Sequence, residues 1–280
     1  MAERIRLGGM ALENGVLVHG PRNWACAVRT DDGEIKVESG PKPLISADVK
    51  STLARGPLKL AETFALLPVV RRRLPEARLP YERPGVLAAL AGGAMATRKL
   101  RTTRLAAPLQ EAAAAVLALA PALYALKGST LAEYHGAEHI SIGSYEHGKP
   151  RTREHERCGS HLVGPLLVMS AAGSLVARAA PPHLRLLARS TAAVGAMAAS
   201  TEVFSWMVKN ERHPVAKALA RPGHELQQRV LTAEPSAEQL EVAQAALAEC
   251  LRLEQADSTR GLQSNGDGGR SGDPEEAPPT

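Results

Sequence analysis

Aromatic residues are scarce in this 280-residue chain, at 3% of the sequence, although hydrophobic residues reach 44%. The apolar residues are therefore mainly Ala, Val and Leu, which suit closely packed helices better than a large sheet. Few aromatic rings also leave few surfaces for stacking on bases, so we expect no nucleic-acid partner. The fold class predicted is mainly α, with Ala-rich helices and a small N-terminal β unit.

Cysteine is rare as well, because the chain has only Cys26, Cys158 and Cys250. An odd number of widely spaced cysteines excludes a disulfide framework and favours a reducing compartment or the cytoplasmic face of a membrane. Residues 1–30 lack the charged-then-apolar order of a secretory signal. We therefore expect no export from the cell.

Uninterrupted apolar runs of about 20 residues, the length of a membrane-spanning helix, are missing. Four Ala-rich stretches approach that length, and each is short or interrupted by proline or charge: residues 85–97, 105–126, 162–177 and 190–208. Alanine adds little driving force for insertion compared with leucine. A multi-pass membrane helical bundle and a set of buried helices in a soluble protein both remain open.

Positive charge exceeds negative charge by 5, and it is clustered. Arg71–Arg73 and the segment 98–104 place basic side chains beside apolar stretches. Such clusters suit anionic lipid headgroups, and the alternative is an ordinary solvated surface. We expect membrane lipid as a partner, a cell-membrane location with the motif loop on the cytoplasmic side, and a cytoplasmic location as the alternative. A further small-molecule or protein partner is left open.

Changes in composition divide the chain into a β-rich unit, a helical core, an amphipathic C-terminal helix and a disordered tail: residues 1–50, 51–230, 231–256 and 257–280. Asp31-Asp32-Gly33 predicts a hairpin turn inside the β unit. The sequence from Ser236 to Gln239 is a capping box, which predicts the start of the C-terminal helix. Histidine and cysteine gather in a motif loop at residues 128–161 of the helical core.

The first half of this motif is His135-x-x-Glu138-His139. A capping box at Thr130 and a terminating Gly148 predict a helix over residues 131–147. Residues four apart share one side of a helix, so both imidazoles point the same way. The order is that of inverzincins, in which two histidines bind zinc and the glutamate activates water. We predict Glu138 as the general base.

The second half is His155-x-x-Cys158. A thiolate is a soft ligand that favours zinc, and the neighbouring Arg153 and Arg157 favour the thiolate form. We predict a zinc site, with another divalent metal as the alternative, formed by His135 and His139 together with His155 and Cys158. Four protein ligands would indicate a structural site, whereas three would leave a position for catalysis.

The motifs, taken in order, resemble the YqhQ-like family, a bacterial family described as predicted metal-dependent enzymes. The resemblance covers most of residues 8–253 and rests on these segments: 8–16, 20–22, 55–56 with Glu62, 134–139, 145–146, 155–160, 231–235 and 238–243. It implies a multi-pass membrane protein whose motif loop lies between two helix pairs. It also implies a metal site that includes the five residues His135, Glu138, His139, His155 and Cys158. No substrate is implied.

Two function hypotheses follow. The first is a membrane-associated metal-binding protein that acts as a zinc-dependent hydrolase on an unknown substrate. The alternative is a non-enzymatic membrane scaffold or partner-binding protein, in which zinc pins the motif loop as a structural element. The number of protein ligands distinguishes the two hypotheses.

Overall fold

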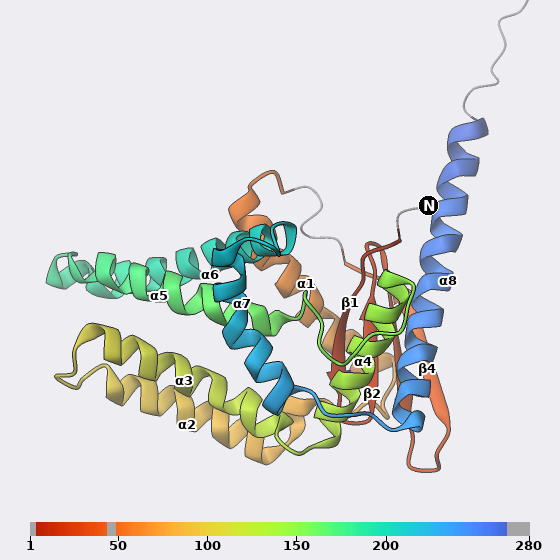
Figure 1. Cartoon of the computed structure of the whole chain (residues 1–280), viewed down its shortest axis with the longest axis horizontal. Helices are drawn as coiled ribbons and strands as arrows, with labels where there is room; N and C mark the ends of the chain where they lie inside the picture. Colours follow the sequence, from red (N-terminus) through yellow and green to blue (C-terminus); the bar gives the residue numbers. More distant parts are fainter. Residues whose placement is uncertain (1–3, 44–48, 268–280) are drawn as a thin grey trace, which may run out of the picture.

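The computed structural model describes residues 4–43 and 49–267 (Figure 1). Helices make up most of it, and a four-stranded antiparallel sheet lies near the N-terminus. The predicted fold class, mainly α with a small N-terminal β unit, is confirmed at this level. Residues of the sheet and of the helix that carries the motif belong to one cluster of buried apolar side chains. The predicted β unit therefore packs directly on the predicted helical core.

The strands follow one another in the sheet in chain order: β1 (Gly8–Leu12), β2 (Gly15–His19), β3 (Asn23–Arg29) and β4 (Ile35–Pro41). Gly33 has a φ of 87° in the turn between β3 and β4, a conformation that glycine adopts without steric cost. The hairpin predicted at Asp31-Asp32-Gly33 is therefore confirmed.

Alternate residues of the central strands pack on opposite faces of the sheet, as the two-residue period of a strand requires. On one face, Val16, Val18, Ala25 and Ala27 pack with α4 (Thr130–His147) and α8 (Ala237–Asp267). On the other face, Leu17, Trp24, Cys26 and Val28 pack with α1 (Thr52–Arg73). The sheet thus separates two apolar layers, and the motif helix α4 belongs to the first.

Two helical hairpins project together from this sheet-and-helix layer (Figure 1). They are formed by α2 (Pro84–Leu100) with α3 (Ala107–Leu126), and by α5 (Val163–Arg178) with α6 (Arg185–Lys209). Among the described residues, one helix is long and apolar enough to cross a membrane, Gly159–Arg178, which is α5 with the preceding 3-10 turn η2 (Gly159–Leu162). The multi-pass bundle implied by the family resemblance is not established by this observation.

The chain returns from the second hairpin through α7 (Pro214–Leu226) and a π-helical turn, η4 (Gln227–Leu231), before α8 begins. Helix α7 lies against η2, and Gly223 approaches the backbone of Ser160 so closely that a Cβ atom there would overlap it. This close approach sets the segment after α7 beside the motif loop. Two further 3-10 turns, η1 (Pro80–Glu82) and η3 (Pro182–Leu184), precede α2 and α6.

Helix α4 matches the predicted helix, but its predicted capping box is wrong. The N-cap is Ser129, and the Thr130 hydroxyl donates instead to the carbonyl of Glu13 at 3.1 Å. The Glu133 carboxylate accepts a hydrogen bond from Gln239 at 2.6 Å. The side chains of Thr130 and Glu133, which the local pattern assigned to the helix start, therefore bond to residues distant in the sequence.

The capping box predicted for α8 is present. The Ser236 N–H donates to the Gln239 side chain at 2.8 Å, and the Gln239 N–H donates to the Ser236 hydroxyl at 3.3 Å. Helix α8 then continues to Asp267, past the helix end predicted at residue 256. The remainder of the predicted disordered tail, residues 268–280, lies outside the described residues.

Candidate metal centre

Helix α4 places His135 and His139 one turn apart on the same side. The helix ends at Gly148, whose φ of 68° and ψ of 21° lie in the left-handed region, and the Gly148 N–H donates to the Ser144 carbonyl. This is the glycine-terminated helix end that the sequence indicated. The shared side of the histidine pair is therefore a direct consequence of local sequence.

Both histidine rings are anchored at Nδ1 by backbone carbonyls. His135 Nδ1 lies 2.8 Å from the Leu231 carbonyl oxygen, and His139 Nδ1 lies 2.6 Å from that of Arg153. A carbonyl can only accept, so each Nδ1 carries the hydrogen and each Nε2 keeps its lone pair. Metal-binding histidines are usually oriented in this way. The rings are thus prepared as Nε2 ligands.

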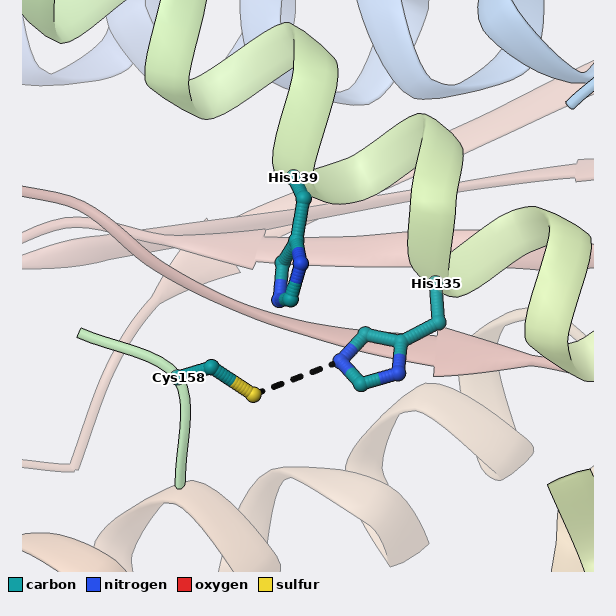
Figure 2. Close-up of side chains that lie close together, drawn as sticks. All are labelled: His135, His139 and Cys158. Carbon is teal, nitrogen blue, oxygen red and sulfur yellow. Dashed lines mark hydrogen bonds between the residues drawn. The ribbon is translucent and has the colours of Figure 1, made fainter. Parts of the chain in front are cut away.

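Cys158 faces this pair from the loop after α4 (Figure 2). Its Sγ lies 3.6 Å from His135 Nε2, and donor atoms of His135, His139 and Cys158 all lie within 4.8 Å of one another. Typical bonds of zinc to nitrogen and sulfur, at a tetrahedral angle, separate the two ligand atoms by about 3.6 Å. The donor types and the distance between Cys158 and His135 are therefore compatible with two ligands of one zinc ion.

Electrostatics favour the neutral form of His139. Burial lowers the pKa of its imidazole, and the neighbouring His135 lowers it further, although a hydrogen bond with Cys158 acts in the opposite direction. Only a neutral imidazole has a lone pair for a metal ion. His139 is therefore in its ligand form at neutral pH.

Glu138 lies on the side of α4 that faces strand β1. Its carboxylate occupies the space beside Gly9, where a Cβ atom on residue 9 would overlap Glu138 Oε1. Burial raises the pKa of Glu138, while the positive charge that His135 and His155 can carry lowers it. Glu138 is thus next to the histidine pair in sequence, but its oxygens are not among the three clustered donor atoms.

The ring of His155 is engaged elsewhere. Its Nε2 lies 3.3 Å from Glu146 Oε2, and its Nδ1 accepts the Arg157 N–H at 3.3 Å. Arg157 also forms an ion pair with Glu146. His155 nevertheless lies beside the cluster, with its ring centroid 5.5 Å from that of His139. Of the four predicted ligands, the structure brings together His135, His139 and Cys158.

Sequence reasoning missed the groups that hydrogen-bond to the two histidine rings or to the loop that carries Cys158. They are the carbonyls of Arg153 and Leu231 and the side chain of Gln227, which is completely buried against the motif loop. Backbone carbonyls have no sequence signal. Gln227 lies about 70 residues beyond the motif, and no local pattern distinguishes it from an ordinary surface glutamine.

Comparisons with known proteins cover the same region. Residues 129–253 match a family model described as "Protein of unknown function (DUF1385)". The "Uncharacterized protein YqhQ" of Bacillus subtilis (strain 168) is 35% identical over 130 residues, which cover 44% of this chain and 41% of that protein. The alignment thus spans less than half of either chain. No solved structure matches this chain.

These two matches support the YqhQ-like family for the part of the chain that contains His135, His139 and Cys158. Neither description states a metal or a reaction. The metal-dependent chemistry implied by the family resemblance therefore remains a proposal.

Proposed function

We propose that this chain is a membrane-associated zinc protein in which His135, His139 and Cys158 hold the metal ion. The observation that carries the proposal is the convergence of these three donor atoms, with both Nδ1 atoms already bound to backbone carbonyls. Thiolate with two imidazoles is a donor set that favours zinc over oxygen-seeking cations such as Mg²⁺. Another divalent metal is the alternative occupant.

Three protein ligands favour a hydrolase over a purely structural site, because zinc is four-coordinate and a catalytic site keeps one position open. When bound, zinc would acidify a water molecule in that position. Glu138 is the general base we propose, since it adjoins His139 on α4 and its burial beside Gly9 holds the carboxyl in one place. The substrate is unidentified.

A second candidate function is a structural zinc clasp in a non-enzymatic scaffold or partner-binding protein. The observation that favours it is the proximity of His155, whose ring centroid lies 5.5 Å from that of His139. Release of His155 from Glu146 would supply a fourth ligand and close the site. The absence of metal-bound water in a zinc-loaded structure would support this candidate.

Association with a membrane is supported by apolar side chains on the outside of both hairpins. They are exposed on each of the four helices: Leu87, Leu90 and Met95; Leu109, Val116 and Tyr124; Leu167, Val168, Leu175 and Val176; Leu186, Leu187 and Val194. Exposed apolar surface of this extent indicates contact with a membrane or a protein partner. Basic residues near the hairpin ends, including Arg98, Arg104 and Arg185, suit anionic headgroups.

The test is metal analysis of protein purified under reducing conditions. We expect one zinc ion per chain in the wild type and in the control His147→Ala, because His147 is exposed on the same helix and its Nδ1 donates to the Gly143 carbonyl. His135→Ala and Cys158→Ala should lose stoichiometric zinc. Wild-type protein without metal would overturn the proposal.

Glu138→Gln separates the two roles that Glu138 could have. The amide keeps the size of the side chain beside Gly9 and removes its basicity. We expect this variant to retain zinc, because Glu138 is outside the donor cluster. Loss of zinc from Glu138→Gln would place Glu138 among the ligands and contradict its role as base.

A further inference from the structure

Gln227 hydrogen-bonds to the motif loop on both sides of Cys158. Its Oε1 accepts the His155 N–H at 3.0 Å, and its Nε2 lies 2.7 Å from Ser160 Oγ, 3.2 Å from His161 Nδ1 and 3.3 Å from the His155 carbonyl. An amide nitrogen has two hydrogens, so the three acceptors share them. Gln227 therefore holds both ends of the segment that carries Cys158.

The Cys158 segment is itself tightly turned. The Cys158 N–H donates to the His155 carbonyl at 3.3 Å, and the His161 N–H donates to the Cys158 carbonyl at 3.0 Å. Gln227 is completely buried beneath this segment. A buried polar group without a hydrogen-bond partner is unfavourable. The loop conformation in which the His155 backbone bonds to Gln227 is therefore preferred to one in which these groups lose their partners.

The π-helical turn η4, which Gln227 begins, also contacts the histidine side of the candidate metal centre. Gln227 is the first residue of the π-helical turn η4, and Leu231, whose carbonyl accepts from His135 Nδ1, is the last. Thr232 closes the turn, since its N–H and its hydroxyl both donate to the Gln227 carbonyl, at 3.2 and 2.9 Å. Single π-helical turns occur frequently at functional sites.

We infer that Gln227 is a positioning residue of the metal centre, through which one π-helical turn sets both Cys158 and His135. The side chain of Gln227 holds the Cys158 loop, and the backbone of the turn that it opens holds the His135 ring. The side chain of Gln227 hydrogen-bonds to His155, Ser160 and His161, so it acts on the proposed ligands through other groups. The inference rests on the proposed zinc site. It adds the residue that brings Cys158 of the loop close to His135 of α4.

The test compares Gln227→Met with the wild type and with the control Gln228→Ala. Methionine keeps the length of the side chain and removes its hydrogen bonds, whereas Gln228 is an exposed neighbour in the same turn. Zinc affinity is measured by competition with a chromophoric chelator. In Co²⁺-loaded protein, the thiolate-to-metal charge-transfer band reports whether Cys158 is bound.

We expect Gln227→Met to bind zinc roughly 10–100-fold more weakly, the usual effect of losing an interaction that orients a ligand. Its thiolate band at saturating Co²⁺ should be weaker, and Gln228→Ala should match the wild type in both measurements. A folded Gln227→Met with a lower unfolding temperature, but unchanged zinc affinity and thiolate band, would overturn the inference.

If Gln227→Met does not fold, Thr232→Val decides the question. This variant keeps the Gln227 amide and removes the hydroxyl bond that closes the turn. We expect weaker zinc binding with the thiolate band retained, because only the acceptor of His135 is displaced. Unchanged affinity would overturn the inference. Wild-type protein that binds no zinc would instead overturn the proposed function, so the two failures are distinguishable.

Discussion

The two glycines of strand β1, Gly8 and Gly9, each leave room for one titratable side chain on opposite faces of the sheet. A Cβ atom on Gly8 would lie 2.7 Å from Nε2 of His19, and one on Gly9 would overlap the Glu138 carboxylate. Neighbouring strand residues point to opposite faces, so Gly8 leaves space for His19 on one face and Gly9 leaves space for Glu138 on the other. The glycine-rich opening that contributes to the family resemblance therefore has a packing reason, and it connects β1 to the motif helix.

Gly9→Ala should destabilise the protein by about 1–3 kcal/mol, because a methyl group must displace the buried Glu138 side chain or the strand. The measurement is the denaturant midpoint. Gly92→Ala is the matched control, since no atom lies within 4 Å of its added methyl group and α2 gains helix propensity. Equal midpoints for Gly9→Ala and the wild type would contradict this packing of Glu138.

We expect His19 to make the stability of the protein depend on pH. Burial lowers the pKa of its imidazole from 6.5 to about 4, and the positive charge of Lys42 acts in the same direction. The unfolded chain therefore takes up a proton near pH 6.5, while the folded chain resists protonation down to about pH 4. The contribution of neutral His19 to the free energy of unfolding is fully present above pH 6.5, and it is lost as the pH falls from 6.5 to about 4.

The expected loss is about 3 kcal/mol between pH 6.5 and 4, since each pKa unit corresponds to about 1.4 kcal/mol. Urea unfolding across this range measures it. His19→Gln should flatten the dependence, whereas the control His183→Gln, which removes an exposed histidine, should not. A parallel pH dependence in His19→Gln and the wild type would show that other groups cause it.

Among the elements, helices α4 and α8 are joined through one side chain. Gln239 caps α8 by accepting the Ser236 N–H, and it donates to Glu133 of α4 at 2.6 Å. A residue that the sequence assigns to local capping thus also connects two helices on the same face of the sheet. The start of α8 and the orientation of the motif helix are therefore coupled.

Gln239→Ala should lower the unfolding free energy by about 1–2 kcal/mol, because a helix cap and a charge-assisted hydrogen bond are lost together. Thermal unfolding measures the change. Gln244→Ala, at an exposed position within α8, is the control and should be close to neutral. If the two variants unfold at the same temperature, the coupling through Gln239 does not contribute to stability.

At the scale of the whole molecule, the candidate metal centre and the apolar surface are adjacent in the chain. Cys158 directly precedes η2 and α5, the helix with the length and composition of a membrane span. The two hairpins lie together on one side of the layer formed by the sheet, α4 and α8 (Figure 1). A bilayer around the hairpins would therefore leave the sheet outside it and the candidate metal centre near its surface.

Val168→Asp tests this arrangement, since Val168 lies near the middle of α5 and is half exposed. A carboxylate within the hydrocarbon costs about 3 kcal/mol, so partitioning into anionic vesicles should fall about 100-fold. Vesicle flotation measures the bound fraction. Ala248→Asp adds the same charge at an exposed position of α8 and should bind like the wild type. Equal flotation of the two variants would contradict insertion of α5.

The sequence by itself determined the features that depend on residues a few positions apart. Helix α4 and its end at Gly148, the shared side of His135 and His139, and the turn at Gly33 all follow from local backbone preferences and helical periodicity. Such patterns act through hydrogen bonds and dihedral angles within one or two turns. Such patterns can therefore be recognised without knowledge of the surrounding fold.

Only the tertiary structure decided which distant groups meet. It places Cys158 against His135, while Glu146 and Arg157 engage the ring of His155. Spacing alone made His155 and Cys158 equal candidates. The loop that carries them hydrogen-bonds to Gln227, some 70 residues later, and no local pattern indicates this contact. The choice between them depends on the burial and pairing of polar groups across the whole chain.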